Sequence, residues 1–231
     1  MNGLNVSPRV TPQQAWDSLQ AGNERFISGD PSHPRQNVER RAELTNTQEP
    51  DAALFGCSDS RLAAEIIFDT GLGDLFVARN MGHVVAESVV ASLEFAVAEL
   101  GIAIIVVLAH DSCGAVKAAV DLTTAKPEPV PKAVENVLQP LIPAVQELWL
   151  KNQHQTPYAD PKNIDFDEVG RIHLGFSVNE LLRSSKLISD AVAAGTLGVV
   201  GCQYSLIEGR AIPISAVGAL DIETVNRNAH D

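Results

Sequence analysis

The stretch Ile102-Ala103-Ile104-Ile105-Val106-Val107-Leu108-Ala109 decides the fold, because it is apolar at every position and rich in β-branched residues. A strand of this kind is buried on both faces, which is typical of the parallel sheets of α/β proteins. Shorter apolar runs at 52–56 and 75–78 predict two further strands, and a mostly apolar helix over 88–100 ends at Gly101. Strands that alternate with helices favour right-handed strand–helix–strand units. We therefore predict an α/β fold with a mostly parallel central β-sheet flanked by helices.

The remaining segments belong to the same domain, with residues 1–50 as an N-terminal helical arm and residues 51–231 as the α/β core. The length of 231 residues fits one fairly large domain. The prolines between 121 and 167 indicate an inserted helical excursion that is not part of the sheet. In chain order, the other predicted helices cover 11–26, 37–45, 134–150 and 176–194. A pair of strands over 197–205 and 211–215 follows the last of these helices.

Composition and charge exclude two classes of protein. The net charge is −12, with 29 acidic against 17 basic residues and no Lys/Arg cluster. Binding to nucleic acid requires a basic face, so we expect no nucleic-acid partner. No apolar run approaches the ~18 residues that a membrane span needs, and the first residues match neither a signal peptide nor a transit peptide. We therefore expect a cytoplasmic protein that has no membrane partner.

The three cysteines also narrow the function. An odd number of cysteines without a secretion signal argues against a disulfide framework and favours metal-binding or nucleophilic roles. Cys202 lies in an apolar run and is predicted to be an inert buried thiol, because free cysteine is among the most buried residue types. Cys57 and Cys113 instead belong to polar motifs.

Those two motifs follow predicted strands directly. Cys57-Ser58-Asp59-Ser60-Arg61 comes after the strand over 52–56, and His110-Asp111-Ser112-Cys113 comes after the strand over 102–109. Because ligands gather at the carboxyl ends of parallel strands, the two motifs can converge on one site. Two thiolates and an imidazole favour zinc over hard cations, and three firm ligands leave one position open, as in catalytic sites. We therefore predict a catalytic zinc site at Cys57, His110 and Cys113.

Simpler interpretations of these residues exist. Cys57 and Cys113 can be buried thiols, and His110 can be a core histidine. Asp59 and Arg61 can form a surface salt bridge, since a carboxylate and a bidentate donor stand one residue apart. A salt bridge does not explain why both residues share a turn with a predicted metal ligand, so we assign them a role in fixing the reacting oxygen. His83, in the polar turn 79–83, is interpreted as structural.

Together these motifs resemble those of the β-class carbonic anhydrases. The similarity covers the whole chain and includes the stretches 23–26 and 73–80 as well as Gly201 and Tyr204. The paired Cys-x-Asp-x-Arg and His-x-x-Cys motifs are far more specific in combination than either is alone. The resemblance implies a homodimer or homotetramer in which the N-terminal arm packs on a neighbouring subunit. It also implies zinc, Zn2+, held by Cys57, His110 and Cys113, with water or Asp59 as the fourth ligand.

The resemblance implies a substrate site as well. Gln48 would donate to the substrate oxygen, and Phe76 would line an apolar pocket suited to a small linear molecule. Phe95 would also lie at this pocket and bind substrate, in the place where plant-type members carry a tyrosine, so the hydrogen bond of that hydroxyl is missing. Leu54 stands where members with a separate bicarbonate site carry a tryptophan, so control of that kind is not expected.

The function implied is the zinc-dependent reversible hydration of carbon dioxide to bicarbonate and a proton by zinc-bound hydroxide. Asp59, held by Arg61, would orient the hydroxide. At lower pH Asp59 would bind zinc and close the site, so that activity favours alkaline pH. One alternative is a hydrolase of carbonyl sulfide or carbon disulfide on the same scaffold. Another is a closed, non-catalytic zinc site that stabilises the fold or senses bicarbonate.

Overall fold

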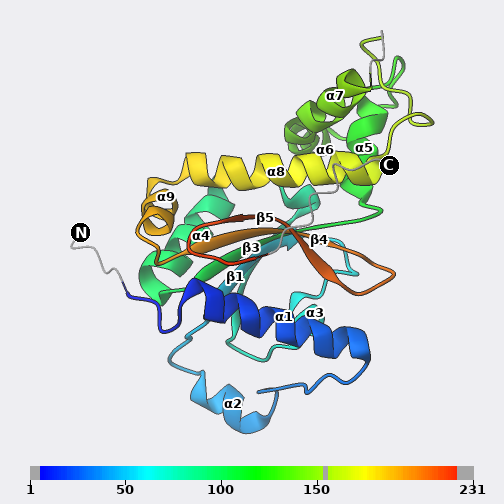
Figure 1. Cartoon of the computed structure of the whole chain (residues 1–231). Coiled ribbons are helices and arrows are strands. Elements are labelled where there is room, and N and C mark those ends of the chain that lie inside the picture. Colours follow the sequence, from blue (N-terminus) through cyan, green and yellow to red (C-terminus); the bar gives the residue numbers. More distant parts are fainter. Residues whose placement is uncertain (1–5, 153–155, 223–231) are drawn as a thin grey trace.

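The computed structural model describes residues 6–152 and 156–222, and a five-stranded sheet lies at its centre (Figure 1). The order of the strands is β2-β1-β3-β4-β5. Strands β1 to β4 are parallel, and β5 is antiparallel to β4. The mostly parallel α/β sheet that the sequence predicts is therefore confirmed. The strands are β1 (Ala52–Cys57), β2 (Leu75–Asn80), β3 (Ile104–His110), β4 (Gly198–Tyr204) and β5 (Ala211–Val217).

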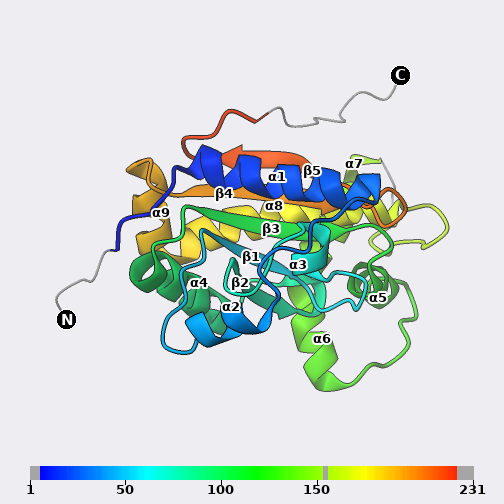
Figure 2. The same ribbon diagram turned by 90° about the horizontal axis from the view of Figure 1, so that it is seen from below.

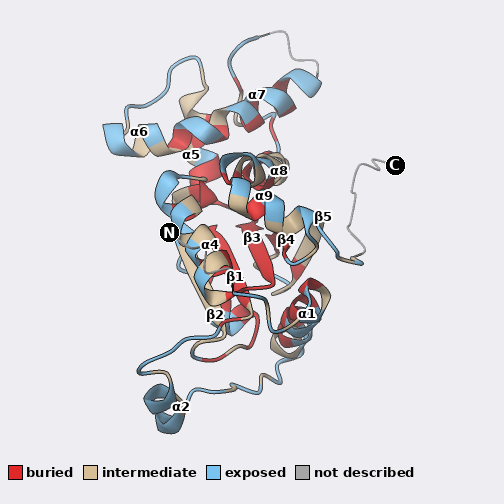
Figure 3. Cartoon of the chain, turned by 90° about the vertical axis from the view of Figure 1, so that its left-hand side faces the viewer, coloured by how far each residue is buried: buried red, intermediate tan, exposed pale blue. Residues whose placement is uncertain are grey.

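The central strands form the core of the molecule. Every residue of β1, β3 and β4 is buried, whereas the edge strands β2 and β5 are mostly half-buried (Figure 3). This difference explains why the unalternating apolar run in β3 is such a clear signal: a strand covered on both faces has no polar side. Residues 102 and 103 precede the strand, so it begins two residues later than the apolar run.

Helices cover both faces of the sheet (Figure 1). Apolar side chains of α1 (Pro12–Ser28) and α3 (Ala64–Ile67) pack against one face. Those of α4 (Glu87–Leu100), α8 (Phe166–Ser184) and α9 (Lys186–Ala193) pack against the other. No helix of the described ranges is long and apolar enough to cross a membrane. The remaining helices are α2 (Val38–Glu43), α5 (Gly114–Leu122), α6 (Lys132–Leu138) and α7 (Ile142–Lys151), with short 3-10 turns η1 (Met81–His83) and η2 (Gln139–Leu141).

The helix predicted over 176–194 is wrong in its bounds. Asp165 caps the backbone N–H groups of residues 167 and 168, so α8 starts ten residues earlier than predicted. The chain then breaks at Ser185, whose side chain caps α9. The early part of α8 escaped detection because Gly170 and His173 interrupt the apolar periodicity of its buried face, which also contains Val169 and Leu174. The start of α4 also differs, because the residue before it is Ala86 and Ser88 lies inside the helix.

Helix α1 of the N-terminal arm packs against its own chain, and the packing of the arm on a neighbouring subunit stays a prediction. Helix α1 begins at a capping box formed by Thr11 and Gln14 and buries Trp16. The Asn23 side chain donates to the carbonyls of Ile67 (3.0 Å) and Gly209 (2.8 Å), which joins α1 to the turn between β4 and β5 (Figure 2). A helix with one apolar stripe needs a partner, and the adjacent face of its own sheet supplies one.

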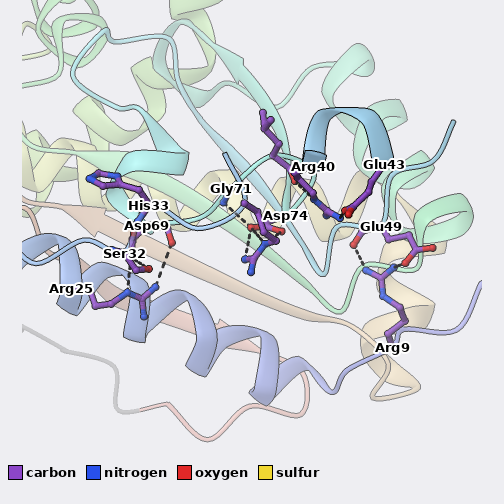
Figure 4. A network of polar contacts seen from close by, with 12 residues as sticks. Arg9, Arg25, Ser32, His33, Arg40, Glu43, Glu49, Asp69, Gly71 and Asp74 are labelled. Carbon is purple, nitrogen blue, oxygen red and sulfur yellow. Dashed lines mark hydrogen bonds and ion pairs between the residues drawn. The ribbon is translucent and has the colours of Figure 1, made fainter. Parts of the chain in front are cut away.

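A polar network fixes the segment that follows the arm (Figure 4). Asp69 is the buried acceptor at its centre, with a side chain that is 1% exposed. It accepts hydrogen bonds from Arg25 Nε (2.5 Å), from the backbone N–H of Ser32 (2.9 Å) and from that of His33 (2.9 Å). Asp74 binds the Arg35 guanidinium in the same region (Nη2 to Oδ2, 2.5 Å). These bonds tie the loop after α1 to the loop between α3 and β2.

Candidate metal centre

Two neighbouring strands and one helix bring Cys57, His110 and Cys113 together. Cys57 is the last residue of β1, and His110 is the last residue of β3, which pairs with β1 in parallel. Cys113 is the residue that precedes α5. Their ligand atoms all lie within 4.8 Å of one another, and all three residues are buried. The convergence at the carboxyl edge of the sheet that the sequence predicts is therefore present in the structure.

The imidazole of His110 is oriented for a ligand. Its Nδ1 lies 2.8 Å from the carbonyl oxygen of Asp111, which can only accept a hydrogen bond, so Nδ1 carries the proton. The lone pair is then on Nε2, which is buried and has no hydrogen-bond partner among the described residues. A metal-binding histidine is commonly fixed in this way, by a backbone carbonyl on its other nitrogen.

The surroundings shift the pKa values of the two thiols in opposite directions. A hydrogen bond with the Cys113 thiol lowers the pKa of Cys57 to about 4, against the effect of burial, and contact with His110 lowers it further. The backbone N–H of Gly82 also points at Cys57 Sγ, at 3.4 Å. The shared proton raises the pKa of Cys113 above its ordinary value. These surroundings favour the thiolate form at Cys57 over Cys113.

This donor set fits zinc. Two sulfurs and one imidazole nitrogen are ligands that zinc prefers, and a cation would satisfy both the orphaned His110 Nε2 and the Cys57 thiolate. Calcium and magnesium prefer oxygen ligands, of which this buried group of three has none. The residues present therefore suit a zinc ion with three protein ligands.

Asp59 and Arg61 form the ion pair that their spacing predicts. Arg61 Nε donates to Asp59 Oδ1 (2.9 Å), and Arg61 Nη2 donates to Asp59 Oδ2 (2.7 Å). The guanidinium holds the pKa of the Asp59 carboxyl well below its usual range. Asp59 Oδ2 also lies 4.0 Å from His110 Nε2, so the carboxylate stands beside the group of three and faces Arg61. Arg61 Nη2 further donates to the carbonyl of Ser112, at 3.3 Å, which links both motifs.

A cavity of about 400 Å³ opens beside Cys113. Asp167 lies in its wall, and Asp167 Oδ1 accepts from the backbone N–H of Ser112 at 2.9 Å. This bond holds Ser112 in the left-handed region, with φ of 50°. Sequence reasoning did not identify Asp167, because it lies 55 residues from Ser112 and in no motif.

The three residues expected to bind substrate lie elsewhere in the chain. Phe76 pairs in register with Ala53, whereas Cys57 pairs with Asn80 at the other end of the same two strands. Phe95 is 47% exposed, and its ring centroid lies 6.3 Å from that of Phe76. Gln48 is exposed and precedes β1. A single chain therefore does not bring these side chains to the metal ligands.

The end of β2 and the turn after it supply contacts that sequence reasoning assigned to no role. Arg79 Nε donates to the Cys57 carbonyl at 2.8 Å, and Arg79 also donates to the Asp59 carbonyl. The backbone of Gly82 reaches the Cys57 sulfur, as described above, and its carbonyl is bound by His173. The polar stretch 79–83 directly after a strand was the available signal, but which ligand it would contact depends on the strand order.

Comparison with known proteins places these residues in a family. The sequence matches the family described as Carbonic anhydrase over residues 52–211. It is 42% identical over 217 residues to Carbonic anhydrase 2 of Mycobacterium tuberculosis, covering 94% of this chain and 99% of that protein. It is also 42% identical over 207 residues to Carbonic anhydrase of Mycolicibacterium smegmatis, covering 88% of this chain and 93% of that protein.

The fold has solved counterparts. A tetrameric β-carbonic anhydrase from Sordaria macrospora is similar with a TM-score of 0.67 and 22% identity, over 89% of this chain and 100% of that chain. At this identity the likeness concerns the fold: the central sheet, the helices on its two faces and the order in which they follow one another.

Proposed function

Because the chain belongs to the β-class carbonic anhydrase family, we propose that it uses zinc, held by Cys57, His110 and Cys113, to interconvert carbon dioxide and bicarbonate. The observation that carries this proposal is the buried Cys–His–Cys group with all ligand atoms within 4.8 Å. The Asp59–Arg61 pair beside it adds a fixed carboxylate at the position where a small substrate would meet the metal.

The protein's own groups would prepare the reaction. Zinc, when bound, acidifies a water molecule and so supplies a nucleophile near neutral pH. Asp59 can accept a hydrogen bond from the attacking oxygen, because its low pKa keeps it ionised. Arg61 fixes the direction of that carboxylate through two hydrogen bonds, so its acceptor lone pairs need no reorganisation during the reaction. The backbone N–H of Gly82 stabilises negative charge on Cys57.

The direct test is stopped-flow hydration of carbon dioxide by the zinc-loaded protein, from neutral to alkaline pH. We expect a fast rate that vanishes in Cys57→Ala. Cys202→Ala is the matched control, because Cys202 is equally buried but belongs to no ligand group among the described residues. Bound zinc without hydration at any pH would contradict the proposal and favour carbonyl sulfide or carbon disulfide as substrate, or a structural zinc.

We further propose that Asp59 exchanges Arg61 for zinc at lower pH and so closes the open position. Its Oδ2 is already 4.0 Å from His110 Nε2, so a small side-chain movement would suffice. Zinc K-edge absorption spectra of the parent protein and of Asp59→Asn, each recorded at acid and alkaline pH, test this exchange. The two proteins should differ at acid pH, where Asp59 would bind zinc, and agree at alkaline pH. An activity that stays flat across this pH range would contradict the exchange.

We also propose that Gln48, Phe76 and Phe95 act across a subunit interface in a homodimer or homotetramer. In one chain they lie far from the ligands, and Phe95 is largely exposed for an aromatic residue. The relative from Sordaria macrospora is described as tetrameric. Analytical ultracentrifugation of the protein and of Phe95→Glu tests this, with loss of assembly as the expected result. The cytoplasmic location stays a prediction.

A further inference from the structure

A buried histidine on α8 reaches the metal ligands through the backbone of one glycine. His173 is 2% exposed, and its Nε2 lies 3.0 Å from the Gly82 carbonyl oxygen. The N–H of the same glycine lies 3.4 Å from Cys57 Sγ. Gly82 is therefore held on one side by an imidazole and points on the other side at a thiolate that would bind zinc.

The direction of the first hydrogen bond is fixed. A carbonyl oxygen can only accept, so His173 Nε2 carries the proton and donates it. Burial lowers the pKa of His173 to about 4, so the ring is neutral at neutral pH. Its Nδ1 is buried without a hydrogen-bond partner among the described residues. The imidazole thus keeps one polar atom unsatisfied in order to make this contact.

Other hydrogen bonds and close packing also fix the turn that contains Gly82. The Asn80 side chain both donates to the Val84 carbonyl (2.7 Å) and accepts from the Val84 N–H (2.9 Å). Gly82 has φ of 73°, and a Cβ at this position would lie 3.0 Å from the Cβ of Ala115. The turn is therefore built around a residue without a side chain, and its orientation depends on contacts with the backbone.

A purely structural role for His173 explains less. An apolar residue at this position would fill the space on α8 without an unsatisfied nitrogen, which costs about 1–3 kcal/mol when it is buried. Ser177, one turn further along α8, makes a 3.4 Å contact with the carbonyl of His83 and a 3.5 Å contact with His173 Nε2. Of these two polar contacts from α8 to the turn, the one from His173 is the shorter, and it ends on the residue that touches Cys57.

We propose that His173 is a positioning residue of the metal centre. It fixes the Gly82 backbone so that the Gly82 N–H stays on Cys57 Sγ, which sets the charge that this sulfur offers to the metal. Because zinc is part of the proposed function, this role rests on that proposal. Outer contacts of this kind typically change metal affinity by about ten- to a hundredfold.

A matched pair of variants tests the role. The amide nitrogen of His173→Gln can occupy the place of Nε2 and donate to the Gly82 carbonyl. His173→Asn carries the same amide on a side chain one methylene shorter, which cannot reach it. Leu174→Ala, a buried neighbour on the same helix with no polar contact, controls for lost packing. His173→Phe fills the space without a donor and repeats the loss if the Asn variant unfolds.

Two measurements are made on each protein. Zinc affinity is measured by competition with a chromophoric chelator, and the sulfur-to-cobalt charge-transfer band is recorded on the cobalt-substituted protein. We expect His173→Asn to bind zinc at least tenfold more weakly and to shift that band, His173→Gln to restore both, and Leu174→Ala to change neither.

The outcomes separate the two proposals. If the parent protein binds neither zinc nor cobalt, the proposed function fails and this role fails with it. If the parent binds both and the Asn and Phe variants match it in affinity and spectrum, the positioning role is overturned while the proposed function stands. Equal losses in Asn and Gln would also overturn it, because restoring the donor would then have no effect.

Discussion

Two aspartate–arginine pairs in this molecule have the same chemistry but different surroundings. Asp69 binds Arg25 and is closed on every side, with a side chain that is 1% exposed. Asp59 binds Arg61 and has a side chain that is 18% exposed. The first carboxylate also accepts from the Ser32 hydroxyl and from two backbone N–H groups. Among the described residues, the second accepts from Arg61 alone, through its guanidinium and its backbone N–H.

The difference separates a structural carboxylate from a functional one. A carboxylate whose lone pairs all accept hydrogen bonds from the protein itself cannot bind a ligand unless some of those bonds break. An acceptor held from one side keeps lone pairs for a ligand, and Asp59 turns them toward His110. Both carboxyls have pKa values below the usual range, so the pKa alone does not tell which one acts.

The largest expected effect is on activity, at the Asp59–Arg61 pair, which we call the open pair. Asp59→Asn removes the charged acceptor with little change in shape, so we expect the rate of carbon dioxide hydration to fall about a hundredfold or more. Because Asp59 pairs with Arg61, whose side chain is 50% exposed, solvent weakens the ion pair, and the free energy of unfolding should change by about 1 kcal/mol or less. Stopped-flow kinetics and urea denaturation of the same preparation measure both. A destabilised but active variant would erase the distinction between the two pairs.

At the Asp69–Arg25 pair, which we call the closed pair, we expect the opposite: a loss of stability without a loss of activity. Asp69→Asn leaves the Arg25 guanidinium and two backbone N–H groups without their charged acceptor in a buried position. Because Asp69 is buried while Arg25 is 40% exposed, we expect the protein to lose about 2 kcal/mol of unfolding free energy, within the range for hydrogen bonds to a charged group. Its hydration rate per folded molecule should match the parent protein. A rate loss as large as that of Asp59→Asn would show that the arm also shapes the metal centre.

The same contrast explains how much the sequence could predict. Asp59 and Arg61 stand two residues apart after a strand, so their pairing and their place beside Cys57 could be inferred locally. The fold could be predicted from the apolar runs, because a strand that is buried on both faces is apolar at nearly every position. Asp69 pairs with Arg25 across 44 residues, and His173 reaches Gly82 across 91. No local sequence pattern predicts such contacts, because they depend on how the helices, strands and loops pack in the tertiary structure.

Acid unfolding should resolve into two windows of pH. Burial raises the pKa of Asp69, but hydrogen bonds from Arg25, Ser32 and His33 outweigh it and lower the pKa overall. The stability from Asp69 is therefore present above about pH 4 and is lost as pH falls below it. Burial lowers the pKa of His173 to about 4, so its contribution is full above about pH 6.5 and declines between there and pH 4.

Denaturant unfolding at a series of pH values separates the windows. Asp69→Asn should flatten the decline below pH 4 and leave the upper window unchanged. His173→Gln should reduce the decline between pH 6.5 and 4 without abolishing it, because burial also lowers the pKa of His83, which packs against His173 at 4.7 Å between ring centroids. A lower window that survives in Asp69→Asn would mean that Asp69 does not dominate acid unfolding.

The smallest effect is expected when the cation of the closed pair is changed conservatively. Arg25→Lys keeps the positive charge beside Asp69 but loses the Nε contact of 2.5 Å. The Arg25 side chain is 40% exposed, and Asp69 retains its bonds from Ser32 and His33, so we expect the free energy of unfolding to fall by about 1 kcal/mol or less.

At the open pair the same exchange, Arg61→Lys, should lower the hydration rate far more, because the Arg61 side chain orients Asp59 and lysine cannot form both bonds. Equal and small effects of Arg25→Lys on stability and Arg61→Lys on hydration would show that neither carboxylate depends on a forked donor. The open pair would then be held by charge alone.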